Sequence, residues 1–216
     1  MKKFLITVLL LFGAFTFISL SAQMANTKDN SNLSQDNNKL YFLVKESFPL
    51  NANGNIFLFE EWIDGIITDS QNERFKISLR YRVANEEMQV QHNNKTKALQ
   101  VQQIKKVEIN DRIFIASNFM LNEEKFMSFF EVISDGNIQL LFQYESKEKK
   151  GVYSIQKTCY SKKGKAPAEK ISFKKKDILN LMKDKKSDIQ NFIKKEKINL
   201  KKSDDIQKLF KFYNSL

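Results

Sequence analysis

The chain has 216 residues, with 36 Lys and Arg against 25 Asp and Glu, and it contains one His, one Cys, two Pro and six Gly. One Cys excludes an internal disulfide framework and a Cys-rich zinc site, and one His excludes a multi-histidine metal site. The scarcity of Pro and Gly excludes a collagen-like or a Pro/Gly-rich disordered chain. With 42% hydrophobic and 28% charged residues, the composition is that of a globular protein.

Residues 1–22 have the order of a secretory signal peptide. Lys2 and Lys3 give a positive start, residues 4–20 are mostly apolar, and small residues lead to Ala22. The alternative is a membrane anchor, but this apolar run of 17 residues is short for a span and no basic cluster follows it. We expect cleavage after Ala22, or after Ser21, which leaves no integral membrane span. Cleavage after Ala22 removes 22 residues and two positive charges, so the mature chain has 194 residues and a net charge of +9.

Residues 23–38 include five Asn and few apolar residues. Such a segment buries too little apolar surface to order itself, so we predict a flexible leader. Residues 39–173 are predicted to form an antiparallel β domain, and residues 174–216 a Lys-rich helical region.

The clearest strand signal is a strict alternation over residues 74–83. One face carries Phe75, Ile77, Leu79, Tyr81 and Val83. The other carries Arg74, Lys76, Ser78, Arg80 and Arg82, and we expect it to face water.

Further strands are predicted at residues 87–91 and 98–102, joined by a hairpin loop at 92–95, and at 127–133, 138–144 and 152–160. Turn signals recur about every 8–12 residues, with no long helical stretch between them, which favours a meander over βαβ units. The predicted fold class is α+β and mostly β. An antiparallel meander forms a curved sheet, an open barrel or a sandwich, and short C-terminal helices follow.

From Lys174 onward the period of the apolar residues becomes helical. Two short amphipathic segments are marked by Ile178, Leu179, Leu181 and Met182, and by Ile189, Phe192 and Ile193. Ser203 is predicted to cap a terminal helix whose first turn carries Asp204 and Asp205. In that helix Ile206, Leu209, Phe210 and Tyr213 form one stripe. Because short helices are marginal alone, we expect them to dock on the β domain or to form a small helical appendage.

Charge divides the same two regions. Residues 147–216 carry 21 Lys and 8 acidic residues, whereas residues 23–146 carry 13 basic and 17 acidic residues. The Lys residues form either a solvated face or a basic surface for an anionic polymer or an anionic membrane surface. The lack of Arg in the basic half, together with export, argues against nucleic acid.

Candidate catalytic residues are few. His92 is expected to lie exposed in a hairpin, and Cys159 to be a buried structural thiol with no obvious base nearby. Adjacent acids such as Glu86 and Glu87 point to opposite faces of a strand and do not share one site. No Gly-rich phosphate loop or nucleophile elbow is present. We therefore assign no catalytic, cofactor-binding or metal residue. The 19 Phe predict a filled core, with an exposed aromatic platform as the alternative.

Several segments together resemble a family of uncharacterised secreted proteins of Bacteroidota. The similar segments are Leu20–Gln23, Leu79–Arg82, Phe129–Ile133 with Gly136 and Leu140–Leu141, Lys176–Leu179 with Phe192–Lys195, and Lys211–Leu216. The resemblance covers about residues 50–216. The chain departs from the family pattern at Arg82 and Val83, which replace Tyr-Asn, and at Phe212, which replaces Tyr. The resemblance implies a location and an architecture but no activity and no site residue.

The sequence therefore favours a non-enzymatic accessory or interaction module of the Gram-negative cell envelope, periplasmic or at the cell surface, with an envelope protein as partner. One alternative is a basic binder of an anionic polymer such as glycan, lipopolysaccharide or nucleic acid, acting through the Lys residues of 147–216. Another is a hydrolase that uses two carboxylates from separate strands. No cofactor is expected.

Overall fold

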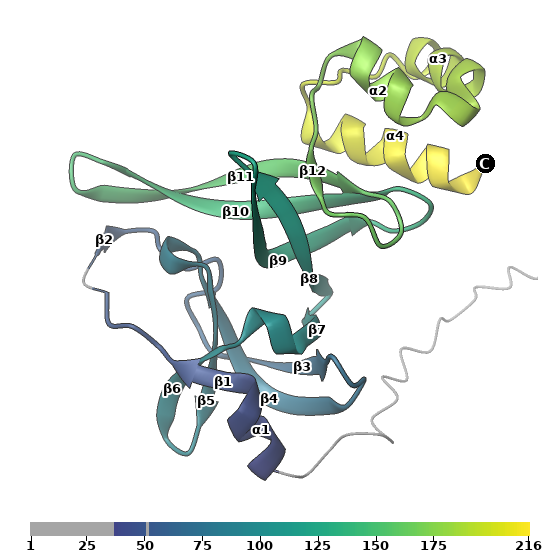
Figure 1. Ribbon diagram of the computed structural model, residues 1–216. Helices are drawn as coiled ribbons and strands as arrows, with labels where there is room; N and C mark the ends of the chain where they lie inside the picture. The colour runs from purple at the N-terminus through teal and green to yellow at the C-terminus, as the bar shows by residue number, and fades with distance from the viewer. Residues whose placement is uncertain (1–36, 51) are drawn as a thin grey trace, which may run out of the picture. The chain divides into compact units, whose positions relative to one another are not determined.

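The computed structural model describes residues 37–216 except Asn51 (Figure 1). The predicted signal peptide, residues 1–22, and most of the predicted leader, residues 23–38, lie outside the described residues. Within the described part of the chain, no helix is long and apolar enough to cross a membrane.

The described residues form one sheet of twelve strands, followed by three short helices. The strands are β1 (Val44–Glu46), β2 (Asn53–Gly54), β3 (Ile63–Asp69), β4 (Arg74–Arg82), β5 (Glu87–His92), β6 (Lys95–Leu99), β7 (Ile104–Ile109), β8 (Arg112–Leu121), β9 (Glu124–Ser134), β10 (Gln139–Lys149), β11 (Val152–Lys162) and β12 (Glu169–Lys170). Their order in the sheet is β1-β6-β5-β4-β3-β7-β8-β9-β10-β11-β12, and β2 pairs in parallel with β11. The other pairs are antiparallel, so the predicted fold class is confirmed.

The sheet curls into an open half-barrel, because side chains from distant strands share one core. Tyr81 of β4, Phe114 of β8 and Tyr144 of β10 belong to the same buried cluster, and the rings of Tyr81 and Phe114 meet edge to face at 5.8 Å. The 3-10 turn Val83–Asn85 reaches β10 and β11 across this interior. Leu79 is fully buried here, as its place on the apolar face of β4 predicts.

A helix replaces the predicted start of the first strand. α1 (Asn37–Leu43) brings Leu40 and Leu43 to one side, and both are buried in the half-barrel core. The sequence predicted β structure from Lys39, since seven residues are too few for a clear helical period. Tertiary packing of the two leucines decides the conformation.

The hairpin between β5 and β6 is tighter than expected. Its turn is Asn93-Asn94 alone, with left-handed φ values of 49° and 59°, so His92 and Lys95 pair within the strands. Two consecutive left-handed residues match the twist of a two-residue hairpin, and Asn tolerates this conformation. The strand predicted at 98–102 lies three residues earlier, at Lys95–Leu99, and Val101–Gln103 form a 3-10 turn.

The C-terminal helices are α2 (Lys175–Leu181), α3 (Lys186–Lys195) and α4 (Ser203–Ser215). They cover the end of the sheet near Ile138 and Leu140, and the predicted stripe of Ile206, Leu209, Phe210 and Tyr213 is buried there. The helical region is therefore docked on the sheet. The predicted N-cap is wrong by one residue: Ser203 is the first helical residue and Lys202 precedes it without a side-chain cap.

Asn214 locks the terminal helix to the turn between β9 and β10. Its Oδ1 accepts a hydrogen bond from the Ile138 N–H at 3.2 Å, and its Nδ2 donates to the carbonyl oxygens of Asp135 and Ile138 at 3.1 and 3.0 Å. Gly136 has a φ of 141°, and a Cβ there would lie 2.5 Å from the Asn214 Cγ. Gly136 and Asn214, 78 positions apart in the sequence, thus meet in space.

Candidate functional site

The positively charged face of β4 is covered at its C-terminal end, at Arg80 and Arg82, whereas Lys76 on the same face is exposed; the expectation of a face open to water is therefore wrong for that end. The segment between β1 and β3 pairs alongside this end of β4: Leu58 N–H donates to the Tyr81 carbonyl at 2.9 Å, and Val83 N–H donates to the Ile56 carbonyl at 2.7 Å. Arg82 is consequently buried. Arg80 is half-buried, with its guanidinium 4.4 Å from the ring centroids of both Phe57 and Trp62.

A buried polar cluster joins β4, β5 and the chain after β1. Arg82 Nη2 lies 2.6 Å from Glu87 Oε2, and Arg82 Nε donates to Asn85 Oδ1 at 2.7 Å. Ser47 Oγ donates to Glu87 at 2.8 Å, and Gln89 Nε2 donates to Ser47 at 2.7 Å. Arg82 also donates to the carbonyl oxygen of Phe48. The cluster therefore fixes the backbone at residues 47–48.

Burial would raise the pKa of Glu87. However, hydrogen bonds from Ser47 and Gln89, the charge of Arg82 and the Phe48 N–H together lower that pKa below its usual value. Glu87 is thus held as a carboxylate and is not suited to be a general acid.

A second cluster lies on the concave side of β8, β9 and β10. Arg112 binds the Glu131 carboxylate through two hydrogen bonds of 2.6 and 2.7 Å and donates to the Tyr144 hydroxyl at 2.8 Å. Tyr144 in turn donates to Glu131. Burial, and then Glu131, raise the pKa of Tyr144 well above its ordinary range. Glu131 is held by two partners, so we interpret this cluster as a link between three strands and not as a reactive acid.

The other residues considered as catalytic candidates are placed as follows. His92 is buried, not exposed as predicted, since the tight turn draws it into β5. Cys159 is half-buried on β11, and burial raises the pKa of its thiol despite Lys157 nearby. Glu86 is exposed and Glu87 is buried, but Glu86 lies outside β5, at the end of the 3-10 turn, in a left-handed conformation. Among residues 37–216 without Asn51, no three His, Cys, Asp or Glu side chains are grouped to hold a metal ion.

Aromatic side chains are exposed along the edge of the sheet. Tyr41 and Phe42 of α1 are 68% and 71% exposed, and Phe48, just after β1, is 67% exposed. By contrast Phe129 and Phe130 are buried. Phe129 and Phe130 thus contribute to a filled core, as predicted, whereas Phe42 and Phe48 are exposed. We call Tyr41, Phe42 and Phe48 the edge aromatics.

The backbone that carries the edge aromatics is firmly held. Gln100 Nε2 donates to the carbonyl oxygens of Phe42 and Val44 at 3.0 and 3.1 Å, and the Gln100 N–H donates to the Leu43 carbonyl at 2.8 Å. The Arg82 cluster holds the Phe48 carbonyl. The sequence alone could not reveal this arrangement, because its partners lie more than 30 positions away along the chain.

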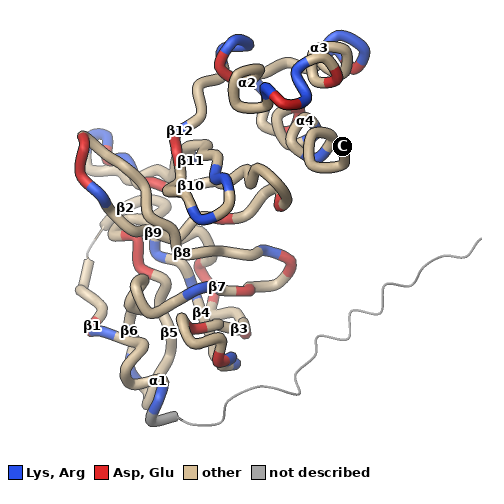
Figure 2. The backbone as a smooth tube through the Cα atoms, turned by 45° about the vertical axis from the view of Figure 1, so that its right-hand side comes forward, with Lys and Arg blue, Asp and Glu red and all other residues tan. Residues whose placement is uncertain are grey.

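The helical region presents many lysines to solvent. Residues 174–216 contain 13 Lys and 6 acidic residues, and Figure 2 shows Lys in blue along α2, α3 and their flanks. Within residues 174–216 the structure has a single ion pair between side chains, Lys208 with Asp205 at 4.0 Å. Lys175 and Lys176 lie in the first turn of α2, where positive charge opposes the helix dipole.

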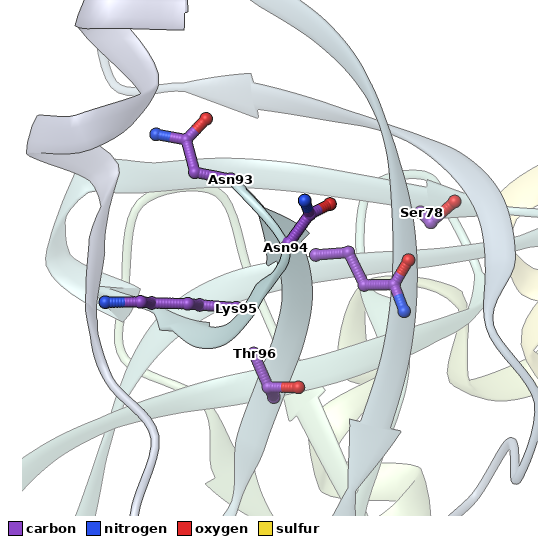
Figure 3. A pocket seen from close by; sticks show the side chains of 6 residues that line it. Ser78, Asn93, Asn94, Lys95 and Thr96 are labelled. Atoms are coloured by element: carbon purple, nitrogen blue, oxygen red, sulfur yellow. The ribbon is translucent and has the colours of Figure 1, made fainter.

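A polar groove lies at the β5–β6 hairpin (Figure 3). It has a volume of about 610 Å³ and is lined by Ser78, Gln91, Asn93, Asn94, Lys95 and Thr96. The sequence analysis did not single out these residues, since amides and hydroxyls on alternating positions also fit an ordinary solvated face. Comparisons of the chain with protein-family models, with curated proteins and with solved structures found no significant match.

Proposed function

We propose that the protein is a non-enzymatic interaction module of the Gram-negative cell envelope and that it binds a protein partner through the edge aromatics. The observation that supports this most is the exposure of Tyr41, Phe42 and Phe48 on a backbone that the core and Gln100 hold in place. Aromatic side chains are enriched at protein interfaces, where a few of them supply most of the binding energy. Exposed rings on a fixed backbone also lose little entropy on binding.

The envelope part of the proposal rests on residues 1–23 and on the resemblance to secreted proteins of Bacteroidota. Mass spectrometry of the protein from its native host should find a mature N-terminus at or beside Gln23. An intact Met1 on material from the envelope fraction would contradict export by cleavage.

Partner binding is tested with tagged full-length protein expressed in the native host. The protein should co-purify with one envelope protein after mild cross-linking, and the double substitution Tyr41→Ser and Phe42→Ser should remove that partner. Val152→Ser is the matched control, because Val152 is 54% exposed at the far hairpin between β10 and β11. Equal recovery with all three proteins would contradict a role for the edge aromatics.

A second candidate function is the binding of an anionic polymer through the helical region. It is favoured by the 13 exposed or partly exposed Lys of residues 174–216. It is also favoured by Lys175 and Lys176, which lie in the first turn of α2, where a positive charge is unfavourable for the helix. If this is right, the protein should be retained on a dextran sulfate column and elute at moderate salt. Substituting Lys194, Lys195, Lys201 and Lys202 by Gln should lower the eluting salt concentration. The same number of Gln substitutions at Lys147, Lys149, Lys150 and Lys163, which are exposed lysines outside the helical region, is the control and should lower it less.

A further inference from the structure

The groove at the β5–β6 hairpin offers hydrogen-bonding groups that the protein itself does not use. The side chains of Gln91, Asn94 and Thr96 make no hydrogen bond to any residue in the described part of the chain, and all three are exposed. Ser78 donates to Asp64 at 2.8 Å, which leaves its oxygen available as an acceptor. The groove therefore presents amide donors, amide acceptors and hydroxyls side by side.

The register of the strands places these groups in one row. Gln91 of β5 lies opposite Thr96 of β6. Gln89, two residues before Gln91 and on the same face of β5, lies opposite Arg80 of β4 and accepts a hydrogen bond from it at 2.8 Å. Beyond Gln91 the two-residue turn keeps Asn93 and Asn94 in fixed left-handed conformations. The row is thus rigid at both ends.

An aromatic side chain adjoins the polar row. Trp62 is half-buried and its ring stacks on the Arg80 guanidinium at 4.4 Å, and Phe57 stacks on Arg80 at the same distance. This stacking holds the Trp62 ring beside Arg80, which is the next residue after Ser78 on the same face of β4. A ligand that fills the groove and extends toward Arg80 would reach an apolar ring face beside a line of polar groups.

The charge of the groove distinguishes between kinds of ligand. No carboxylate lines it, and its one cation, Lys95, extends away from Ser78 in Figure 3. Nearby charges are paired: Lys76 with Asp64 at 3.7 Å, and Lys97 with Glu46. A phosphate or another strong anion would find no converging cations here, whereas a neutral ligand with many hydroxyls would find donors and acceptors at close spacing.

We propose that this groove binds a neutral oligosaccharide. The amides of Gln91 and Asn94 and the hydroxyl of Thr96 would bind sugar hydroxyls, and Trp62 would contact the apolar face of a neighbouring ring. This site is separate from the edge aromatics and does not depend on the protein partner.

The test measures binding of purified mature protein to soluble hexasaccharides by saturation-transfer NMR and calorimetry. The neutral probes are the hexasaccharides of maltose, cellulose, mannan and xylan, and the acidic probe is hexagalacturonic acid. We expect one or more neutral probes to bind and the acidic probe to bind no more tightly. Gln91→Ala with Thr96→Ala should weaken binding by about tenfold or more, as expected for the loss of several hydrogen bonds.

Asn191→Ala, an exposed amide on α3, is the control and should leave binding unchanged. Since Gln91 and Thr96 are exposed, the double variant should keep its melting temperature, which separates lost binding from lost folding. Absence of binding to every probe would overturn the proposal, as would binding that the double variant retains. Tighter binding of hexagalacturonic acid would overturn its neutral character. Because the assay contains no envelope protein, each of these outcomes leaves the partner proposal intact.

Discussion

Glu87 shows at the scale of one residue how this protein holds a charge in its interior. Its carboxylate accepts hydrogen bonds from Arg82, Ser47 and Gln89, and its pKa is lowered as a result. A group whose pKa is lower in the folded state stabilises the fold above its unfolded pKa, and that contribution is lost as the pH falls through the folded value. The stabilisation is therefore present at pH 7 and absent in strong acid.

Glu87→Gln should lower the free energy of unfolding by about 3 kcal/mol at pH 7, because it leaves Arg82 buried without its counter-charge. The difference from the unchanged protein should shrink as the pH falls below the ordinary carboxyl pKa of about 4 and on through the lower pKa of Glu87 in the folded protein, where Glu87 itself becomes neutral. Urea unfolding at pH 7 and pH 3 measures both values. Glu61→Gln, an exposed carboxylate, is the control. An equal loss at the two pH values would contradict the assignment.

Leu79 and Arg80 test the two faces of β4. Leu79→Ala should cost about 2–5 kcal/mol, as for other fully buried leucines. Arg80→Ala should cost about 1 kcal/mol, less than Leu79→Ala but measurable, because the guanidinium is stacked between two rings. Lys76→Ala, on the same face but exposed, should cost almost nothing. Equal losses for Arg80 and Lys76 would show that the stack contributes no stability.

Asn214 tests the contact that joins the last helix to the sheet. Asn214→Ala leaves the Ile138 N–H without its partner, and an unsatisfied buried group costs about 1–3 kcal/mol. For a protein of this size each kcal/mol corresponds to about 2–4 °C in melting temperature. Ser215→Ala is the neighbouring control, since the exposed Ser215 hydroxyl bonds only within its own helix, to the Phe212 carbonyl. Identical melting curves for the two variants would contradict the proposed lock.

Among the helices, α4 depends most clearly on packing, because the other helices and the sheet cover its apolar stripe. Its four stripe residues are buried against the other helices and the end of the sheet, and Gln207 Nε2 donates to the Ile133 carbonyl at 3.2 Å. Tyr213 also donates to Asp184, which ties α4 to the turn before α3.

Deleting residues 203–216 should therefore make the protein unfold at a much lower temperature or aggregate. Each buried side chain contributes about 1.5–3 kcal/mol, against a total stability of about 5–15 kcal/mol. Thermal unfolding of the full and shortened chains measures the effect. An unchanged melting temperature would mean that α4 is a detachable segment.

Much of the element order could be predicted from the sequence, because strands and helices space their apolar residues with different local periods. Alternation gave β4, β5 and most of β9 to β11, and the helical period gave α2 to α4. β3, β7 and β8 have no counterpart among the predicted strands, and two further differences depend on distant contacts. α1 is helical because two leucines reach the core, and Arg80 and Arg82 are covered by a segment more than 20 positions away. The edge aromatics are positioned by such distant contacts, so no local pattern could have identified them. The groove residues are close in sequence, but their alternating amides and hydroxyls also fit an ordinary solvated face.

For the molecule as a whole, the central claim is that the edge aromatics bind an envelope protein. The most direct measurement places a photo-cross-linking amino acid at Phe42 and, in a second strain, at Val152, and irradiates intact cells of the native host. We expect one discrete protein adduct from position 42 and no adduct of that mass from position 152. No adduct at position 42, or the same adduct at both positions, would contradict it.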